Sequence, residues 1–126
     1  MLFRSDKVIF TGYRSDVYDI YPEIDLVVHP SHSENLGGAA ESLMLAVPTV
    51  SSDVGGFPDI VIPDKTGCLA RAKDPADLAE KITWAVENQT KIKEMAINGQ
   101  ALVTELLDLD NTAARIHEVY NKILNT

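Results

Sequence analysis

The fold is decided by residues 25–52, which read DLVVHPSHSENLGGAAESLMLAVPTVSS. The short apolar run Leu26–His29 is rich in Val and is typical of a strand buried on both faces of a parallel sheet. Small and polar residues follow it as far as Gly38, and strong helix formers continue from Ala39 to Ala46. The pattern therefore predicts a strand, a glycine loop, a helix and a second strand at Thr49–Ser51.

A loop that leads into a helix N-terminus offers unpaired backbone N–H groups and a partial positive charge. Both suit a phosphate or another anion. Gly37 and Gly38 have no Cβ atom, so they would let a bulky ligand approach these N–H groups closely. A loop that merely needs unusual backbone angles would explain the same two glycines equally well.

Two carboxylates flank the glycines. Glu34 precedes them, and Glu41 lies in what we predict to be the first turn of the helix. Because anionic side chains repel phosphate, we expect them to accept hydrogen bonds from ligand hydroxyls beside it, such as those of a sugar or a ribose. The alternative is that Glu41 meets the helix dipole and Glu34 is a solvated loop charge.

The length of 126 residues predicts one domain over residues 1–126, and the net charge of −8 argues against binding to nucleic acid or anionic lipid. The single cysteine, Cys68, excludes an internal disulfide and favours a reducing, cytoplasmic location. We expect it to be a buried strand residue. No apolar run is long enough to span a bilayer, and no signal peptide is recognisable.

The other elements alternate between strand and helix. They are a strand at Val8–Thr11, a helix from a Ser15 cap to Ile20 or Tyr21, a helix at Pro58–Val61, a strand at Cys68–Ala70, a helix at Ala76–Glu87 opened by Asp74 and Pro75, a helix at Lys91–Leu106, and a last helix from Asn111 or Thr112 to Leu124 capped by Asp110. This order predicts a Rossmann-like α/β fold, with a parallel sheet of about four strands flanked by helices and a helical C-terminal run. A first strand so near Met1 suggests that earlier strands of a larger nucleotide-binding sheet are missing.

A second glycine turn follows the strand at Thr49–Ser51, in the sequence Asp53-Val54-Gly55-Gly56. Because the carboxyl ends of neighbouring parallel strands meet at one edge of a sheet, we expect both glycine turns there, where ligands of open α/β folds bind.

Two helices carry apolar stripes at helical spacing. Leu78, Ile82, Ala85 and Val86 form the first, and Trp84 is expected to pack on the sheet. The second stripe consists of Ala113, Ile116, Val119, Tyr120 and Ile123 in the last helix. It must be buried against a partner surface, for which the sheet is the obvious candidate and a missing domain the alternative.

His29 and His32 lie close together, but no third ligand follows at a recognisable spacing, so no metal site is predicted. We expect His29 to be a packing residue at the strand end. His32 stands near the glycines and is a candidate ligand contact, whereas Arg14 is expected to be solvated.

The segment at residues 30–61, PSHSENLGGAAESLMLAVPTVSSDVGGFPDIV, resembles the donor-binding core of retaining glycosyltransferases of family 4, also called group 1, which have the GT-B fold. Flanking pieces agree: VIFTGYRSDV, DLVVHPS and DKTGCLA, with Tyr120 at the place of the family's terminal aromatic residue. The resemblance covers nearly the whole chain but only the C-terminal half of a family member, so it implies half of a GT-B fold.

In that family two glutamates separated by seven residues flank the donor, the first at the transferred sugar and the second at the ribose hydroxyls. Glu41 matches the second. Only six residues separate Glu34 from Glu41, so Ser33 stands where the family has its first glutamate. Either the loop is one residue shorter or the sugar contact has changed.

The resemblance further implies that the N–H groups around Leu36, Gly37 and Gly38 face the donor diphosphate, and that Gly55, Gly56 and Asp59 support the crevice. The family's basic pair, an Arg and a Lys that neutralise the leaving diphosphate, lies upstream of this chain, so no catalytic residue is assigned. The N-terminal acceptor domain is absent as well, and any peripheral membrane contact would come through it.

The implied function is sugar transfer from a nucleotide-diphosphate sugar to an acceptor such as a glycan or a lipid-linked glycan, without cofactor or metal. The chain alone is expected to be inactive, because transfer needs a positioned acceptor and a stabilised leaving group. Two alternatives remain open: a non-catalytic α/β binding module, and a GT-B nucleotide-sugar epimerase fragment, which would need its own acid–base residues.

Overall fold

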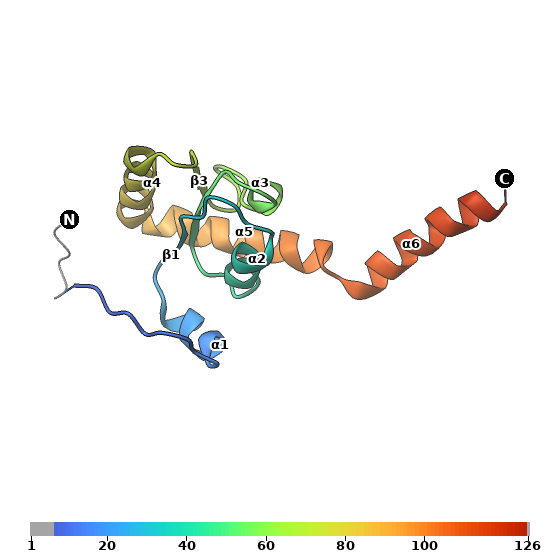
Figure 1. Cartoon of the computed structure of the whole chain (residues 1–126), viewed down its shortest axis with the longest axis horizontal. Coiled ribbons are helices and arrows are strands. Elements are labelled where there is room, and N and C mark those ends of the chain that lie inside the picture. Colours follow the sequence, from blue (N-terminus) through green and yellow to red (C-terminus); the bar gives the residue numbers. More distant parts are fainter. Residues whose placement is uncertain (1–6, 126) are drawn as a thin grey trace.

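The structure, a computed structural model, describes residues 7–125 and has a small parallel sheet at its centre (Figure 1). Its strands are β1 (Val27–His29), β2 (Thr49–Ser52) and β3 (Cys68–Ala70), in the order β1-β2-β3. Val28 pairs with Val50, and Val50 pairs in turn with Cys68. The Rossmann-like α/β class is confirmed, with three strands rather than four in the described chain.

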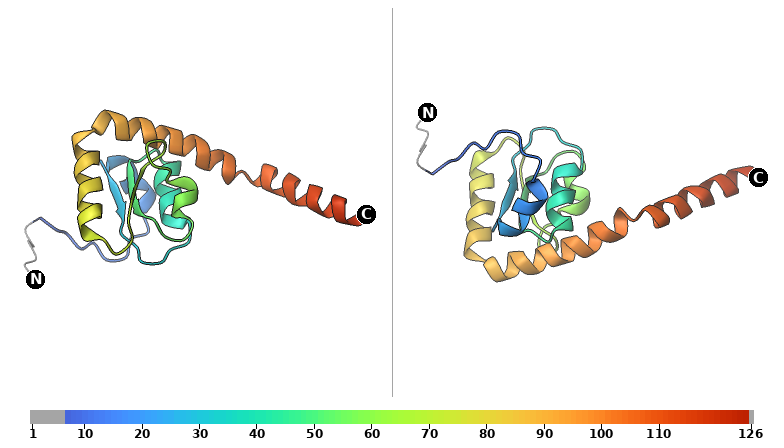
Figure 2. Two further views of the ribbon diagram at one scale, coloured as in Figure 1. Left: turned by 90° about the horizontal axis from the view of Figure 1, so that it is seen from above. Right: turned by 90° about the horizontal axis from the view of Figure 1, so that it is seen from below.

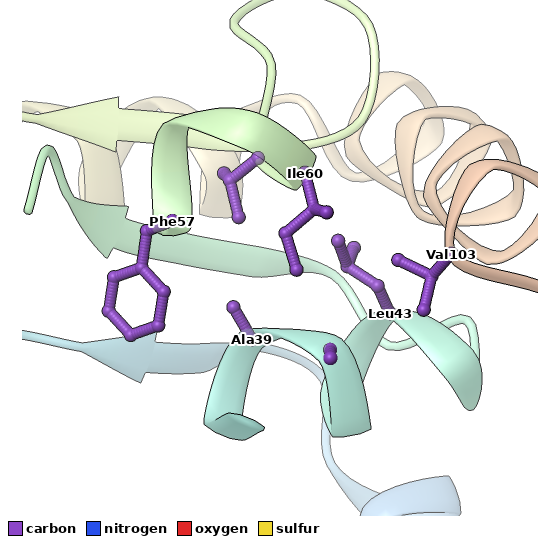
Figure 3. Packing of buried hydrophobic residues seen from close by; sticks show 7 residues of the cluster. Ala39, Leu43, Phe57, Ile60 and Val103 are labelled. Carbon is purple, nitrogen blue, oxygen red and sulfur yellow. The ribbon is translucent and has the colours of Figure 1, made fainter. Parts of the chain in front are cut away.

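One face of the sheet is covered by α2 (Gly37–Met44) and α3 (Phe57–Ile60), and the long helix α5 (Gln89–Leu106) reaches the same side. Figure 3 shows the cluster between them, in which side chains from all three helices meet. Its buried members are Ala39, Ala40, Leu43, Phe57, Ile60, Val61 and Val103. This packing fixes the position of α2, the helix that follows the glycine loop.

The opposite face is covered by α4 (Pro75–Glu87) and the first half of α5. The cluster here consists of Val50, Cys68, Ala85, Ile92 and Met95, with Trp84 partly buried against it. Cys68 is buried and unpaired, as expected. The predicted stripe of α4 was wrong at one position, because Val86 points away from the cluster and is 56% exposed.

The predicted strand at Val8–Thr11 was wrong. This segment has no regular structure, and Ile9 and Phe10 are 88% and 82% exposed. Strand formation depends on a neighbouring strand and on burial as much as on β-branched residues. The described sheet pairs β1 only with β2, and the segment does not reach it.

The segment leads instead into α1 (Val17–Ile20) and a 3-10 turn, η1 (Tyr21–Glu23). The N-cap of α1 is Asp16 rather than Ser15, and it makes no side-chain capping bond. Asp16 is held instead by the guanidinium of Arg14, so the Arg14 side chain is paired rather than simply solvated. The hydrogen bond from Arg14 lowers the pKa of the Asp16 carboxyl.

Several helix boundaries differ from the prediction, most of them by one or two residues. Helix α2 begins two residues earlier, at Gly37, so Glu41 lies in its second turn rather than its first. It ends at Met44, and Ala46 then adopts a positive φ of 54° as the chain turns toward β2. The last helix, α6 (Leu109–Leu124), is capped by Asp108 instead of Asp110, because Asp108 accepts a hydrogen bond from the Asn111 backbone N–H at 2.7 Å.

Helix α6 projects away from the body of the molecule in every view (Figures 1 and 2). None of its residues is buried, and the apolar side chains of its stripe are exposed, Tyr120 by 61% and Ile123 by 65%. The expectation that this stripe packs on the sheet was therefore wrong. Within residues 7–125, no helix combines the length and apolar character needed to cross a membrane.

The cap of α4 gives a test of local stability. The Asp74 side chain accepts hydrogen bonds from the N–H groups of Ala76 and Asp77 at 3.1 and 3.0 Å. We expect Asp74→Ala to lower the free energy of unfolding by about 0.5–2 kcal/mol in chemical denaturation. Asp74→Asn is the control, because asparagine also caps helices and only the exposed ion pair with Arg71 is lost. Equal losses in both variants would contradict the capping role.

The exposure of α6 predicts weak protection of its backbone. A helix of 16 residues without packing is marginally stable in water. In hydrogen exchange, we expect the amides of α6 to exchange faster than those of α5 around the buried residues Met95, Ala96 and Val103. Protection equal to that of α5 would mean that α6 packs against another surface in solution.

Candidate functional site

The loops that leave the three strands meet at the carboxyl edge of the sheet. The Asp53 backbone N–H donates to the Ala70 carbonyl at 2.9 Å, and its carboxylate accepts from the Ala72 N–H at 2.7 Å. The Gly56 N–H donates to the Asn35 carbonyl at 3.2 Å. Both glycine turns therefore lie at the same edge, as the sequence predicted.

The second glycine turn packs directly on the first loop. Gly55 has a positive φ of 55°, and a Cβ atom there would overlap the backbone carbonyl of Glu34. A Cβ atom on Gly56 would lie 3.0 Å from the Leu36 Cδ1. Only glycine lets the two backbones come this close. Asp59 lies on α3 and is exposed. Its contact with this turn is made by the backbone N–H, which donates to the Gly56 carbonyl.

The first turn of α2 is open on one side. Its N-cap is Leu36, whose half-buried side chain packs on the cluster around Phe57 and offers no capping oxygen. A Cβ atom on Gly37 would meet nothing within 4 Å. By contrast, α4 and α6 are capped by aspartates. An anion at the start of α2 would meet backbone N–H groups that no side chain in residues 7–125 caps.

Gly38 makes room for a side chain of the protein itself, whereas the sequence predicted that it makes room for a ligand. A Cβ atom there would lie 3.1 Å from Cε1 and 3.2 Å from Nδ1 of His29. The missing side chain thus makes room for the imidazole beneath the loop, rather than for a ligand above it.

His29 is a packing residue at the end of β1, as predicted. Its ring lies 5.6 Å from the ring of Phe57, and Nε2 lies 3.4 Å from Ser42 Oγ. Burial lowers the pKa of His29, and the negative charges of Glu34 and Glu41 act in the opposite direction.

Ser42 and Thr49 form a buried group of hydrogen-bonded side chains with His29, which the sequence analysis did not predict. Ser42 Oγ donates to the Ala39 carbonyl at 3.1 Å, and Thr49 Oγ1 donates to Ser42 Oγ at 2.9 Å. These side chains lie between α2 and the sheet, and both residues are fully buried. In the sequence, the one sign of this group is the hydroxyl of Ser42 beside the apolar residues of the predicted helix.

Glu34 is half-buried and tied to its own loop. Its carboxylate accepts from the Asn35 N–H at 2.9 Å and from Ser31 Oγ at 3.4 Å. The neighbouring Ser33 is exposed. His32 is exposed as well, and it lines a cavity of about 190 Å³ with Ser52, Arg71 and Lys73. Neither Gly37 nor Gly38 lines this cavity.

Glu41 lies on the side of α2 that faces α1. Tyr18 donates its hydroxyl to Glu41 Oε1 at 3.5 Å. Burial raises the pKa of Tyr21, and the Glu41 charge raises it further. Glu41 is half-exposed, so its second oxygen can still accept a hydrogen bond from a ligand hydroxyl. Within residues 7–125, no three His, Cys, Asp or Glu side chains gather in a group that could hold a metal ion.

Residues 2–102 match the family described as "Glycosyl transferases group 1". The chain is 25% identical over 123 residues to the lipopolysaccharide core biosynthesis mannosyltransferase LpsB of Rhizobium meliloti (strain 1021). That match covers 95% of this chain and 35% of LpsB. The chain thus spans about a third of the length of this curated relative.

Two solved structures are similar. HepE of Anabaena in complex with UDP superposes with a TM-score of 0.83 at 27% identity, over 94% of this chain and 33% of HepE. The C-terminal domain of a group 1 glycosyl transferase, LpcC from Francisella tularensis, gives a TM-score of 0.69 at 25% identity, over 81% of this chain and 53% of that domain. Proteins like these have the GT-B fold, so the chain has the fold of a C-terminal GT-B domain.

The contact between the glycine turns can be tested by substitution. Gly55→Ala adds a Cβ atom at a positive φ and against the Glu34 carbonyl, so we expect the free energy of unfolding to fall by at least about 2 kcal/mol. Gly12→Ala is the control, because Gly12 has a φ of 66° but nothing within 4 Å of its Cβ position. A Gly55→Ala variant as stable as Gly12→Ala in thermal unfolding would disprove the close contact.

Proposed function

Because the chain belongs to the group 1 glycosyl transferases, we propose that it binds the nucleotide-diphosphate sugar that serves as donor in sugar transfer. The observation that carries this proposal is the open first turn of α2, where Leu36 offers no cap and Gly37 has free space beside it. This turn lies at the carboxyl edge of the sheet, where parallel α/β folds bind nucleotides.

In this proposal the donor diphosphate lies on the backbone N–H groups of Gly37 and its neighbours. Oriented amides and the helix dipole favour an anion there. These amides have to attract the anion over a short range, because the chain as a whole carries a net charge of −8 and repels it. The Gly55-Gly56 turn supports the loop from beneath through its contact with Glu34 and Asn35.

Glu41 accepts hydrogen bonds from the ribose hydroxyls. One of its oxygens lies within reach of Tyr18, which orients the carboxylate and leaves the second oxygen for the ligand. The transferred sugar lies near Glu34 and Ser33. Because Glu34 already accepts from Asn35 and Ser31, the exposed Ser33 is the freer of the two for a sugar contact.

The chain forms a single donor-binding domain that works together with an acceptor-binding domain. The exposed apolar stripe of α6 is the surface on which we place that second domain, because Ile116, Val119 and Tyr120 are 52%, 56% and 61% exposed. The sugar is transferred with retention, without a metal or a cofactor, and in the cytoplasm. The acceptor is a glycan or a lipid-linked glycan.

The chain alone is inactive in this proposal. Transfer requires the acceptor to be held against the donor, and the charge that builds up on the leaving diphosphate to be stabilised. Of the side chains that we place at the donor, Glu34 and Glu41 are acidic and Ser33 is uncharged. None of them supplies the positive charge that a departing diphosphate needs.

We expect UDP, the nucleotide bound in the HepE structure, to shift backbone amide signals of residues 33–41 and 55–59 in an NMR titration of the labelled chain. Glu41→Ala should weaken UDP binding by about 1–3 kcal/mol, or about 5- to 140-fold, because charged hydrogen bonds to the ribose are lost.

Glu118→Ala on α6 is the control, since it removes the same charge from an exposed position far from the sheet edge (Figure 1). No amide shift at millimolar UDP or GDP would contradict nucleotide binding and favour a non-catalytic binding module. Binding that Glu41→Ala leaves unchanged would contradict only the role of Glu41.

A further inference from the structure

The imidazole of His29 lies between the end of β1 and the first turn of α2. Its Cε1 and Nδ1 atoms occupy the space next to the Gly38 Cα, so that a Cβ atom there would come within 3.1–3.2 Å of them. Since Gly38 is the second residue of α2, the ring is in contact with the turn whose N–H groups face outward. The ring therefore limits how closely this turn can approach the end of β1.

The ring is held on its other sides. Phe57 of α3 packs against it at a centroid distance of 5.6 Å, and Ser42 Oγ lies 3.4 Å from Nε2. Ser42 Oγ is itself anchored in α2, where it donates to the Ala39 carbonyl at 3.1 Å. Thr49 donates to the same oxygen from β2. The imidazole is thus held in place from the helix side and the sheet side.

We propose that His29 is a positioning residue for the nucleotide donor: its ring sets the depth at which the first turn of α2 sits on β1, and so directs the N–H groups of Gly37 and Gly38 at the diphosphate. This inference rests on the proposed function. His29 itself touches no ligand in this arrangement, because Gly38 lies between the ring and the open side of the turn.

The shape of the ring, rather than a charge, is what matters. Burial disfavours the imidazolium, so His29 is neutral near pH 7 despite the carboxylates of Glu34 and Glu41 that face it. Within residues 7–125, Glu34 and Glu41 are the charged groups that shift its pKa, and the ring also lies beside Ser42, Phe57 and Gly38. A hydrogen bond to phosphate weakens steeply when donor and acceptor are misaligned, so a small shift of this turn lowers affinity.

Two opposite changes should therefore compensate each other. His29→Ala removes the support and lets the turn sink toward β1. Gly38→Ala adds a methyl group that pushes the turn away from the ring. In the double variant, the new methyl group occupies part of the space that the imidazole left.

The experiment is a double-mutant cycle in which UDP affinity is the measured quantity. The affinity of each variant is determined from the amide shifts of the labelled chain, well below its unfolding temperature. We expect each single variant to weaken UDP binding about 5-fold or more, and the double variant to bind at least about 5-fold better than the product of the two single effects predicts. His29→Gln, which keeps an N–H for Ser42, should recover part of the affinity that His29→Ala loses.

The matched control is the same cycle with Gly37→Ala in place of Gly38→Ala. A Cβ atom on Gly37 meets nothing within 4 Å, so its effect and that of His29→Ala should multiply without coupling. Thermal unfolding of every variant separates folding from binding. Should His29→Ala fail to fold, the cycle is carried out with His29→Gln, whose flexible side chain also gives way to the methyl group.

The outcomes are distinct. Variants that lower the unfolding temperature but leave UDP affinity unchanged, or that show no coupling between positions 29 and 38, would overturn the positioning role and leave nucleotide binding intact. A wild-type chain that binds neither UDP nor GDP would overturn the proposed function, and the positioning role with it.

Discussion

The structure depends on the contact between two backbone turns at the carboxyl edge of the sheet. Gly55 packs so closely on the Glu34 carbonyl that no Cβ atom fits, and the Gly56 N–H bonds to the Asn35 carbonyl. This contact holds the loop that precedes α2 against the loop that follows β2. Since the second loop is bonded in turn to the segment after β3 through Asp53, the whole edge behaves as one connected surface.

Beneath this edge, polar and apolar packing act together. Leu43, Phe57 and Ile60 bury the inner side of α2 and α3, as Figure 3 shows, and supply the free energy that holds the helices on the sheet. Ser42 and Thr49 lie in the same interface and are hydrogen-bonded, so their burial carries little penalty. Such a network fixes a helix more specifically than apolar contacts, because its bonds tolerate little displacement. His29 joins this network to the glycine loop.

Both ends of the described chain expose apolar side chains, unlike the packed body between them. The segment before α1 exposes Ile9 and Tyr13, and α6 exposes a full apolar stripe. Exposed apolar area of this kind is typical of a surface that another domain covers. The relative LpsB is about three times as long as this chain.

The sequence by itself determined the elements whose signals are local. Cys68–Ala70, the helix opened by Asp74, and the succession of strand, glycine loop and helix all depend on residues adjacent in the chain, and the family followed from the motif they form. Tertiary structure decided the rest. Val8–Thr11 has strand-forming residues but no neighbouring strand within residues 7–125, the stripe of α6 is exposed, and Gly38 faces His29 rather than open space. These outcomes depend on which groups lie opposite one another in space, and a pattern along one chain does not contain that information.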